Sequence, residues 1–88
     1  MSEIELTETF RKLYAKLPQN IQTKAKKKLR LLAKNTRYPS LQSKPIEGAP
    51  GTFEARVDRD DHLTYERLIG DVLRIRAIGK HDEALKNP

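Results

Sequence analysis

With 88 residues, the chain is long enough for a modest core, and we expect residues 1–88 to form a single domain. It has no cysteine, which excludes disulfides and thiol chemistry, and no apolar run approaches the roughly 20 residues that span a bilayer. The net charge of +6 favours a nucleic acid, an anionic membrane or an acidic protein as partner, without choosing among them. The acidic N-terminus has no signal-peptide pattern, so we expect a cytoplasmic protein with no membrane partner.

The first part of the chain predicts a short strand followed by a helix. Ile4 and Leu6 alternate with polar residues, as they would in a strand with one buried face. A helix should begin at Thr7 or Thr9, either of which can cap it, because an apolar stripe follows at positions 10, 13, 14 and 17. Pro18 ends this helix and suits the first turn of the next one.

The second helix is expected to be amphipathic and strongly basic. Its apolar stripe consists of Ile21, Ala25, Leu29, Leu32 and Ala33. Its opposite face carries Lys24, Lys26, Lys27, Lys28, Arg30 and Lys34. The helix should fade by Asn35, because Pro39 disfavours helical backbone at Tyr38.

Residues 40–51 are expected to form a connecting loop. They hold turn signals at Pro45, Gly48 and Pro50-Gly51. A single apolar anchor, Leu41 or Ile46, should hold this loop to the core.

Residues 52–82 predict three consecutive strands, joined by short links that favour antiparallel hairpins. Apolar residues occupy odd positions and should face the core, including Leu73, Ile75 and Ala77 in the last strand. The even positions should form an open face that gathers Arg56, His62, Arg74 and Arg76, with Glu54, Thr64 and Glu66 among them. The predicted fold is α+β, in the order β-α-α-β-β-β, with two helices packed on a small, mostly antiparallel sheet.

The chemistry of this open face suits a phosphodiester backbone. Arginine presents a planar, permanently charged fork to phosphate oxygens. Histidine titrates near pH 6.5 and can transfer protons. Arginines and a histidine on one rigid sheet therefore indicate a surface for a phosphodiester backbone, whereas a single arginine or histidine could also be a solvated surface residue.

Element order, length and several motifs together resemble the RelE/ParE superfamily of toxins from prokaryotic type II toxin–antitoxin modules. The motifs are residues 10–17, Tyr38-Pro39-Ser40-Leu41 with Lys44 and Gly48, Phe53-Glu54-Ala55-Arg56-Val57, Leu63-Thr64-Tyr65-Glu66, Gly70-Asp71 and Ile78-Gly79-Lys80-His81-Asp82. The histidine after the last strand is similar to the YafQ-like branch. The resemblance implies a metal-independent endoribonuclease without cofactor that cuts messenger RNA, usually on the ribosome, and that an acidic antitoxin blocks.

The resemblance also suggests roles for particular residues. Arg56 and Arg76 match basic positions and are assigned to binding the phosphate and its transition state. His81 matches the histidine of the family and is assigned to proton transfer; strict alternation would turn position 81 toward the core unless a bulge or turn at Gly79 resets the phase. His62 is the candidate second proton-transfer group, although related sequences often carry arginine there. Asp82 could orient His81 or cap a local turn.

Further basic residues are candidates for holding RNA phosphates. They are Lys44, Arg74, Lys27 and Arg30, each of which could also be a solvated surface charge. Two departures weaken the family pattern: Pro45 and Ile46 follow Lys44 where a second basic residue is common, and Leu85 stands where an aromatic residue is expected.

Two other functions remain open at this point. Members of the ParE branch share the fold but poison DNA gyrase, so the chain could be a non-enzymatic toxin that binds a protein target, or an RNA-binding domain whose active site has decayed. A metal site formed by His62, His81 and Asp82 is the weakest alternative, because their spacing fits no standard set of ligands.

Overall fold

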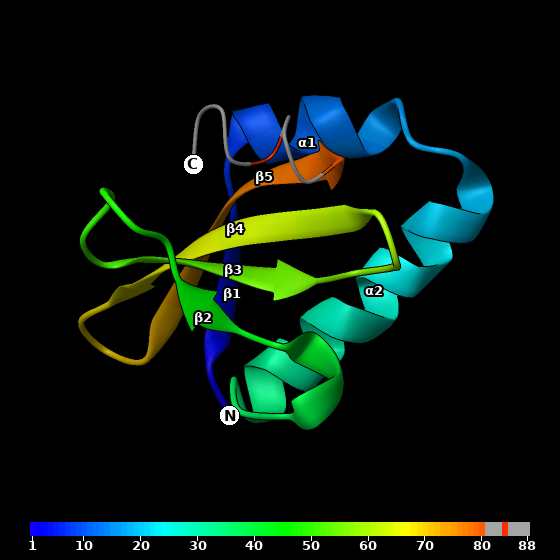
Figure 1. The fold of residues 1–88 in the computed structure, drawn as a ribbon. Coiled ribbons are helices and arrows are strands. Elements are labelled where there is room, and N and C mark those ends of the chain that lie inside the picture. Colours follow the sequence, from blue (N-terminus) through cyan, green and yellow to red (C-terminus); the bar gives the residue numbers. More distant parts are fainter. Residues whose placement is uncertain (81–83, 85–88) are drawn as a thin grey trace.

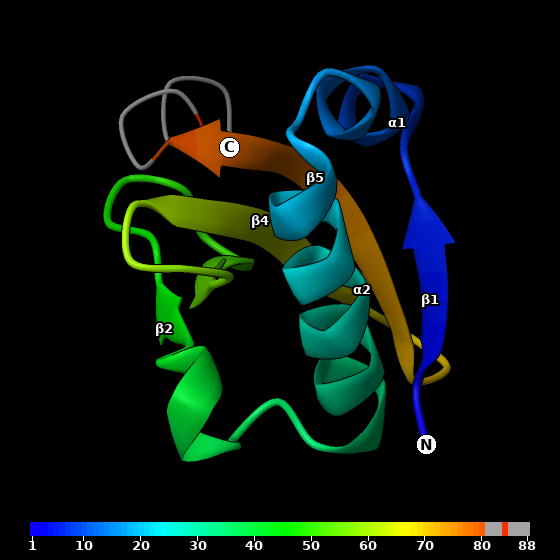
Figure 2. The same cartoon turned by 90° about the vertical axis from the view of Figure 1, so that its right-hand side faces the viewer.

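Two helices pack on one face of a five-stranded sheet (Figures 1 and 2). The computed structural model describes residues 1–80 and Ala84. The helices are α1 (Glu8–Ala15) and α2 (Gln19–Lys34), and the sheet contains β1 (Glu3–Leu6), β2 (Lys44–Pro45), β3 (Thr52–Arg56), β4 (Asp61–Leu68) and β5 (Val72–Lys80). The strand order is β1-β5-β4-β3-β2, with β1 parallel to β5 and all other pairs antiparallel. This arrangement confirms the predicted α+β fold.

Thr7 begins α1 and ties it to the centre of the sheet. Its hydroxyl oxygen accepts a hydrogen bond from the backbone N–H of Phe10 at 3.1 Å, as a helix cap should. The same hydroxyl lies 3.0 Å from the carbonyl oxygens of Ile75 and Arg76 on β5 and can donate to either. Of the two predicted caps, Thr7 is therefore the one used. Pro18 occupies the N-cap position directly before α2, without a side-chain capping bond, and the helix ends at Lys34, as expected.

The core lies between the helices and the sheet. Phe10 of α1 and Ala25 and Leu32 of α2 meet the core-facing side chains of the central strands. The largest of these fully buried strand side chains are Leu63, Tyr65, Ile75 and Ile78. No helix among the described residues is both long and apolar enough to cross a bilayer.

The segment predicted as a connecting loop is more ordered than expected. A short 3₁₀ helix, η1 (Pro39–Leu41), buries Leu41 completely, so Leu41 is the anchor. Lys44 and Pro45 then pair with Glu54 and Phe53 and form the edge strand β2. The prediction of a plain loop was wrong because two residues, one of them a proline, give no periodic signal; proline is nevertheless tolerated on an edge strand.

A β-bulge in β5 corrects the predicted alternation. Thr64 pairs with Ala77, but its neighbour Tyr65 pairs with Ile75, so Arg76 is the extra residue on β5. Beyond the bulge, Ile78 pairs with the core residue Leu63 and joins the core. Ala77 therefore lies on the same face of the sheet as Thr64 and not on the helix-facing side, although it is buried, as predicted. The phase is reset at Arg76, upstream of Gly79.

Candidate functional site

Strand register places Arg56 and His62 side by side on the open face of the sheet. They are direct partners across the β3–β4 pair, and both side chains are half-buried. Partners of this kind in an antiparallel pair have Cβ atoms about 4.5–5.5 Å apart. Gly79 of β5 completes the row next to His62 and adds no side chain. A permanent cation thus lies beside a group that can transfer protons.

The next row of the open face is buried rather than open. Glu54 and Thr64 are partners, with 3% and 0% of their surfaces exposed. Lys44 reaches the Glu54 carboxylate from β2 at 3.2 Å, while 68% of the Lys44 side chain stays exposed. Lys44 therefore keeps most of its surface in solvent, but its charge is already opposed by a buried carboxylate.

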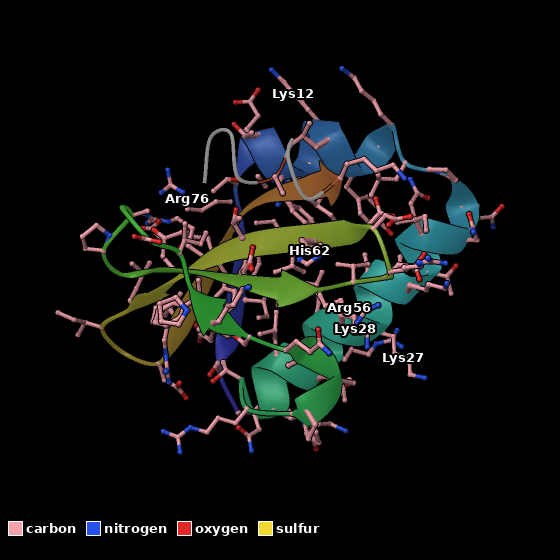
Figure 3. All side chains as sticks on the ribbon, in the orientation of Figure 1. Lys12, Lys27, Lys28, Arg56, His62 and Arg76 are labelled. Atoms are coloured by element: carbon pink, nitrogen blue, oxygen red, sulfur yellow. The ribbon has the colours of Figure 1, made fainter. Side chains whose placement is uncertain are left out.

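Arg56 extends toward α2 and lines a basic groove. Its guanidinium donates to the Gln42 side-chain oxygen and to the Asp58 carbonyl, both at 3.3 Å. The groove has a volume of about 470 Å³. Its charged lining residues are Lys24, Lys27, Lys28, Arg56, Asp58 and Arg59. Figure 3 shows Lys27 and Lys28 projecting from α2 close to Arg56.

One acidic residue in this groove is neutralised locally. Lys24 bonds the Asp58 carboxylate at 3.0 Å, and this hydrogen bond holds the pKa of Asp58 below its usual value. Lys28 approaches the Ser40 carbonyl at 3.4 Å, so no carboxylate opposes it in that contact. The groove is therefore positive on balance, with Arg56, Lys27, Lys28 and Arg59 contributing the excess charge.

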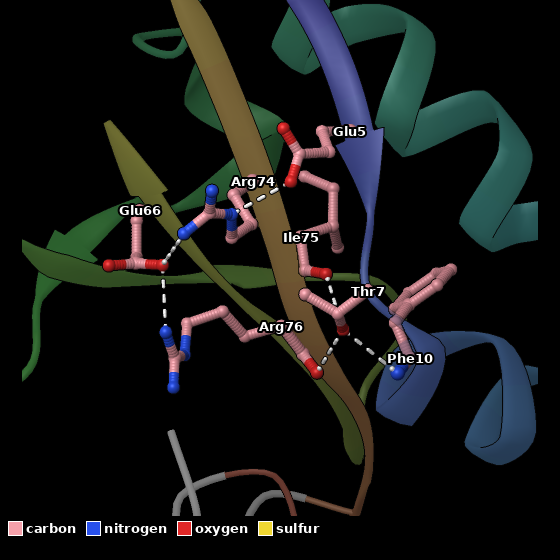
Figure 4. A network of polar contacts seen from close by, with 7 residues as sticks. All are labelled: Glu5, Thr7, Phe10, Glu66, Arg74, Ile75 and Arg76. Atoms are coloured by element: carbon pink, nitrogen blue, oxygen red, sulfur yellow. Dashed lines mark hydrogen bonds and ion pairs between the residues drawn. The ribbon is translucent and has the colours of Figure 1, made fainter. Parts of the chain in front are cut away.

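Arg74 and Arg76 form a second group, held by acidic side chains (Figure 4). The Glu66 carboxylate lies 2.7 Å from Arg76 and 3.6 Å from Arg74. Glu5 of β1 also bonds Arg74 at 2.9 Å, and this bond raises the pKa of Arg74. Figure 3 shows Arg76 and Arg56 on opposite sides of His62, so the open face carries two separate cationic groups.

The structure places the remaining predicted residues as follows. Lys27 lines the groove, whereas Arg30 is exposed on α2 and is not among the described residues that line it. His81, Asp82 and Leu85 lie outside the described residues. Within residues 1–80 and Ala84, no group of three or more histidine, aspartate or glutamate side chains could hold a metal ion.

Sequence reasoning missed Gln42, Lys28 and Arg59 as members of this site. Lys28 was one of several lysines on the predicted helix face, and nothing in the pattern favoured it over its neighbours. Gln42 has a left-handed backbone (φ 45°) and is brought to Arg56 by η1, an element without a sequence signal. Arg59 lies in the link between β3 and β4, and strand alternation does not predict which way a side chain in a link points.

Comparison with known proteins gives structural matches only. The sequence matches no protein-family model and no curated protein. The E. coli DinJ–YafQ complex contains a chain with TM-score 0.74 and 28% identity, covering 94% of this chain and 97% of that one. The intact E. coli RelBE toxin–antitoxin complex gives TM-score 0.74 at 20% identity, over 91% and 96% of the two chains. The YoeB/ParE toxin from Agrobacterium tumefaciens gives 0.76 at 14% identity, over 90% and 98%.

The fold is thus that of the toxins in toxin–antitoxin modules. At 20% and 14% identity, the RelBE and YoeB/ParE matches speak for the fold alone. The higher identity with YafQ extends along nearly the whole length of both chains. These structural neighbours support the RelE/ParE superfamily and its YafQ-like branch, as the sequence motifs indicated.

Proposed function

We propose that the protein is the toxin of a type II toxin–antitoxin module and acts as a metal-independent endoribonuclease on messenger RNA at the ribosome. The observation that carries the proposal is the adjacent pair of Arg56 and His62, beside a groove of lysines and arginines. The similarity to YafQ and RelE supports it. A cation next to a proton-transfer group, flanked by further cations, is the arrangement that cleavage at phosphorus requires.

In the proposed reaction the RNA supplies its own nucleophile. A base removes the proton of a 2′-hydroxyl, and the 2′-oxygen forms a bond to phosphorus. The bond from phosphorus to the 5′-oxygen breaks, and an acid protonates that oxygen. The products are a 2′,3′-cyclic phosphate and a free 5′-hydroxyl, and the reaction consumes no oxidant and requires no metal.

Each candidate side chain has one task in this scheme. Arg56 stabilises the charge on the phosphorane, while His81 and His62 transfer the two protons. Strict alternation does not hold along β5, because the phase is reset at Arg76; His81 itself lies outside the described residues. Arg76 contributes only when it is released from, or shared with, Glu66.

The proposed partner in the resting state is an acidic antitoxin protein. E. coli RelBE and DinJ–YafQ were each solved as a toxin–antitoxin complex. The net charge of +6 and the basic groove offer such a partner a complementary surface.

Cleavage mapping tests the proposal. Purified protein should cut messenger RNA on translating ribosomes, leaving cyclic or 3′-phosphate ends, and a chelator should not change the rate. His62→Gln and His81→Gln should each lower the rate, because glutamine hydrogen-bonds but does not titrate, and each should flatten one limb of the pH–rate profile. Lys12→Ala, on the exposed side of α1, is the matched surface control (Figure 3).

Three results would overturn the proposal. Products with 3′-hydroxyl ends would exclude attack by the 2′-oxygen. Loss of cleavage in the presence of a chelator would indicate a metal-dependent mechanism. Growth arrest with intact RNA and inhibited gyrase would instead identify a ParE-like toxin, which is the alternative that shares this fold.

A further inference from the structure

A second hollow lies between η1 and the edge of the sheet, and we call it the aromatic pocket. It has a volume of about 320 Å³. Its aromatic lining residues are Tyr38, Phe53 and Tyr65, and its basic ones are Arg37, Lys44 and Arg67. None of the described residues that line it is acidic. None of the described residues that line it is a candidate catalytic residue, and only Lys44 is among the residues already considered for binding RNA.

Tyr38 offers the pocket an accessible ring. The side chain of Phe53 is stacked on Tyr65, with ring centroids 5.5 Å apart, and the Arg67 guanidinium lies 6.0 Å from the Phe53 ring centroid. Those rings are therefore already engaged. Tyr38, by contrast, is 38% exposed, and its backbone is fixed because its N–H donates to Asn35 and its carbonyl accepts from Leu41. A rigidly mounted, exposed ring can stack on a planar ligand at little entropic cost.

The cations of the aromatic pocket belong to a longer basic surface. Gln42 lines both this pocket and the groove at Arg56, so the two hollows are neighbours on either side of that residue. Arg37 and Arg67 also line a third hollow, near the N-terminus, together with Lys34. We call the path from the groove, past Gln42, to the aromatic pocket the basic track.

We propose that the basic track binds single-stranded RNA over several nucleotides, with one unpaired base stacked on Tyr38 and the flanking phosphates held by Arg37 and Arg67. The inference rests on the proposed function, in that RNA is the ligand. An exposed aromatic ring in a hollow that is also lined by arginines suits an unpaired base and its phosphates. An acidic peptide would need the cations but not the ring, so the track favours RNA.

The test is binding to an RNA that cannot be cleaved. A fluorescently labelled single-stranded oligonucleotide with 2′-O-methyl groups lacks the attacking hydroxyl, so anisotropy reports binding alone. Tyr38→Ala should weaken binding about fivefold or more, the lower range for one lost stacked base. Tyr38→Phe, which keeps the ring, should bind like the wild type. Arg37→Ala should reduce the slope of log affinity against log salt by about 0.7, the value for one phosphate contact on a single strand.

Controls and outcomes keep this inference apart from the proposed catalysis. Arg11→Ala removes an exposed arginine from α1, away from the track, and should leave affinity and salt slope unchanged. Equal binding by Tyr38→Ala and the wild type would overturn the inference, even if the protein cleaves RNA. The inference would also be overturned if Tyr38→Ala and Arg37→Ala bound an acidic antitoxin peptide more weakly but bound RNA as the wild type does. If RNA binding depends on Tyr38 but the protein cleaves no RNA, the RNA-binding inference is supported and the proposed endoribonuclease activity is refuted.

Discussion

Arg56 and His62 are neighbours because β3 and β4 pair in one particular register. Their separation in sequence is set by a turn in which the N–H groups of Val57 and Asp58 both donate to the Asp61 carbonyl. A slip of one residue would turn either side chain to the core face, where a charge would be costly to bury. The register is therefore fixed by the buried partners Ala55 and Leu63 on the other face. Packing of the core thus determines the relative positions of Arg56 and His62.

Glu66 provides a test of the second cationic group at the level of single residues. Its carboxylate is shared between Arg74 and Arg76, which are 38% and 39% exposed, so these ion pairs contribute little stability. A phosphate that binds either arginine must compete with this carboxylate. We expect Glu66→Gln to strengthen binding of the uncleavable oligonucleotide and to steepen its salt dependence, because a competing charge is removed.

The matched control for this prediction is Glu3→Gln. Glu3 is an exposed carboxylate on β1, and the change in net charge is the same. If both variants gain affinity equally, the effect is one of net charge alone. Weaker binding by Glu66→Gln would show that Glu66 positions the arginines rather than competing with RNA.

At the scale of elements, one hydroxyl joins the first helix to the sheet. Thr7→Ala removes the cap of α1 and the contact with β5 together, and should lower the free energy of unfolding by about 1 kcal/mol, within the range of about 0.5–2 for such caps. Urea denaturation with a constant m-value measures this change. Thr7→Ser keeps the hydroxyl and should recover most of the stability. Thr9→Ala lies inside α1 and should cost little; an equal loss there would contradict the assignment of Thr7 as the cap.

Elements with a periodic signal could be predicted, and those without one could not. Both helices and the three long strands follow from apolar residues at helical or alternating spacing, and Thr7, Pro18 and Asn35 mark ends near the observed ones. The edge strand β2 is too short to show alternation. The bulge at Arg76 arises because the register between β4 and β5 shifts, and a register shift is a property of two strands that neither sequence shows alone.

The candidate site was predictable only in part, for the same reason. Alternation within strands placed Arg56, His62, Arg74 and Arg76 on one face. It could not show that Glu66 would draw Arg74 and Arg76 into one group while Arg56 turned toward α2. Those arrangements depend on side-chain contacts between elements far apart in the chain. The groove itself requires α2 and the β3–β4 link to meet, which no local pattern reveals.

At the scale of the whole molecule, the excess positive charge is concentrated along α2 and the adjoining loops. The groove, the aromatic pocket and the hollow near the N-terminus follow one another along this side. An RNA and an acidic antitoxin would therefore be attracted to the same region. If both bind there, an antitoxin would block RNA by occupying this surface, with no change in the fold.

Salt dependence tests this shared attraction. The affinity for the cognate antitoxin, measured by calorimetry, should fall as the salt concentration rises, because ions screen exposed charge pairs beyond about 10 Å at 0.1 M. The double variant Lys27→Ala/Lys28→Ala, which removes two groove cations, should weaken the antitoxin and flatten this dependence, whereas Arg11→Ala/Lys12→Ala on α1 removes the same charge and should change neither. An affinity that stays constant from low to high salt would mean that apolar contacts hold the antitoxin. Equal effects of the two double variants would mean that only the net charge matters, and that the antitoxin does not cover the groove.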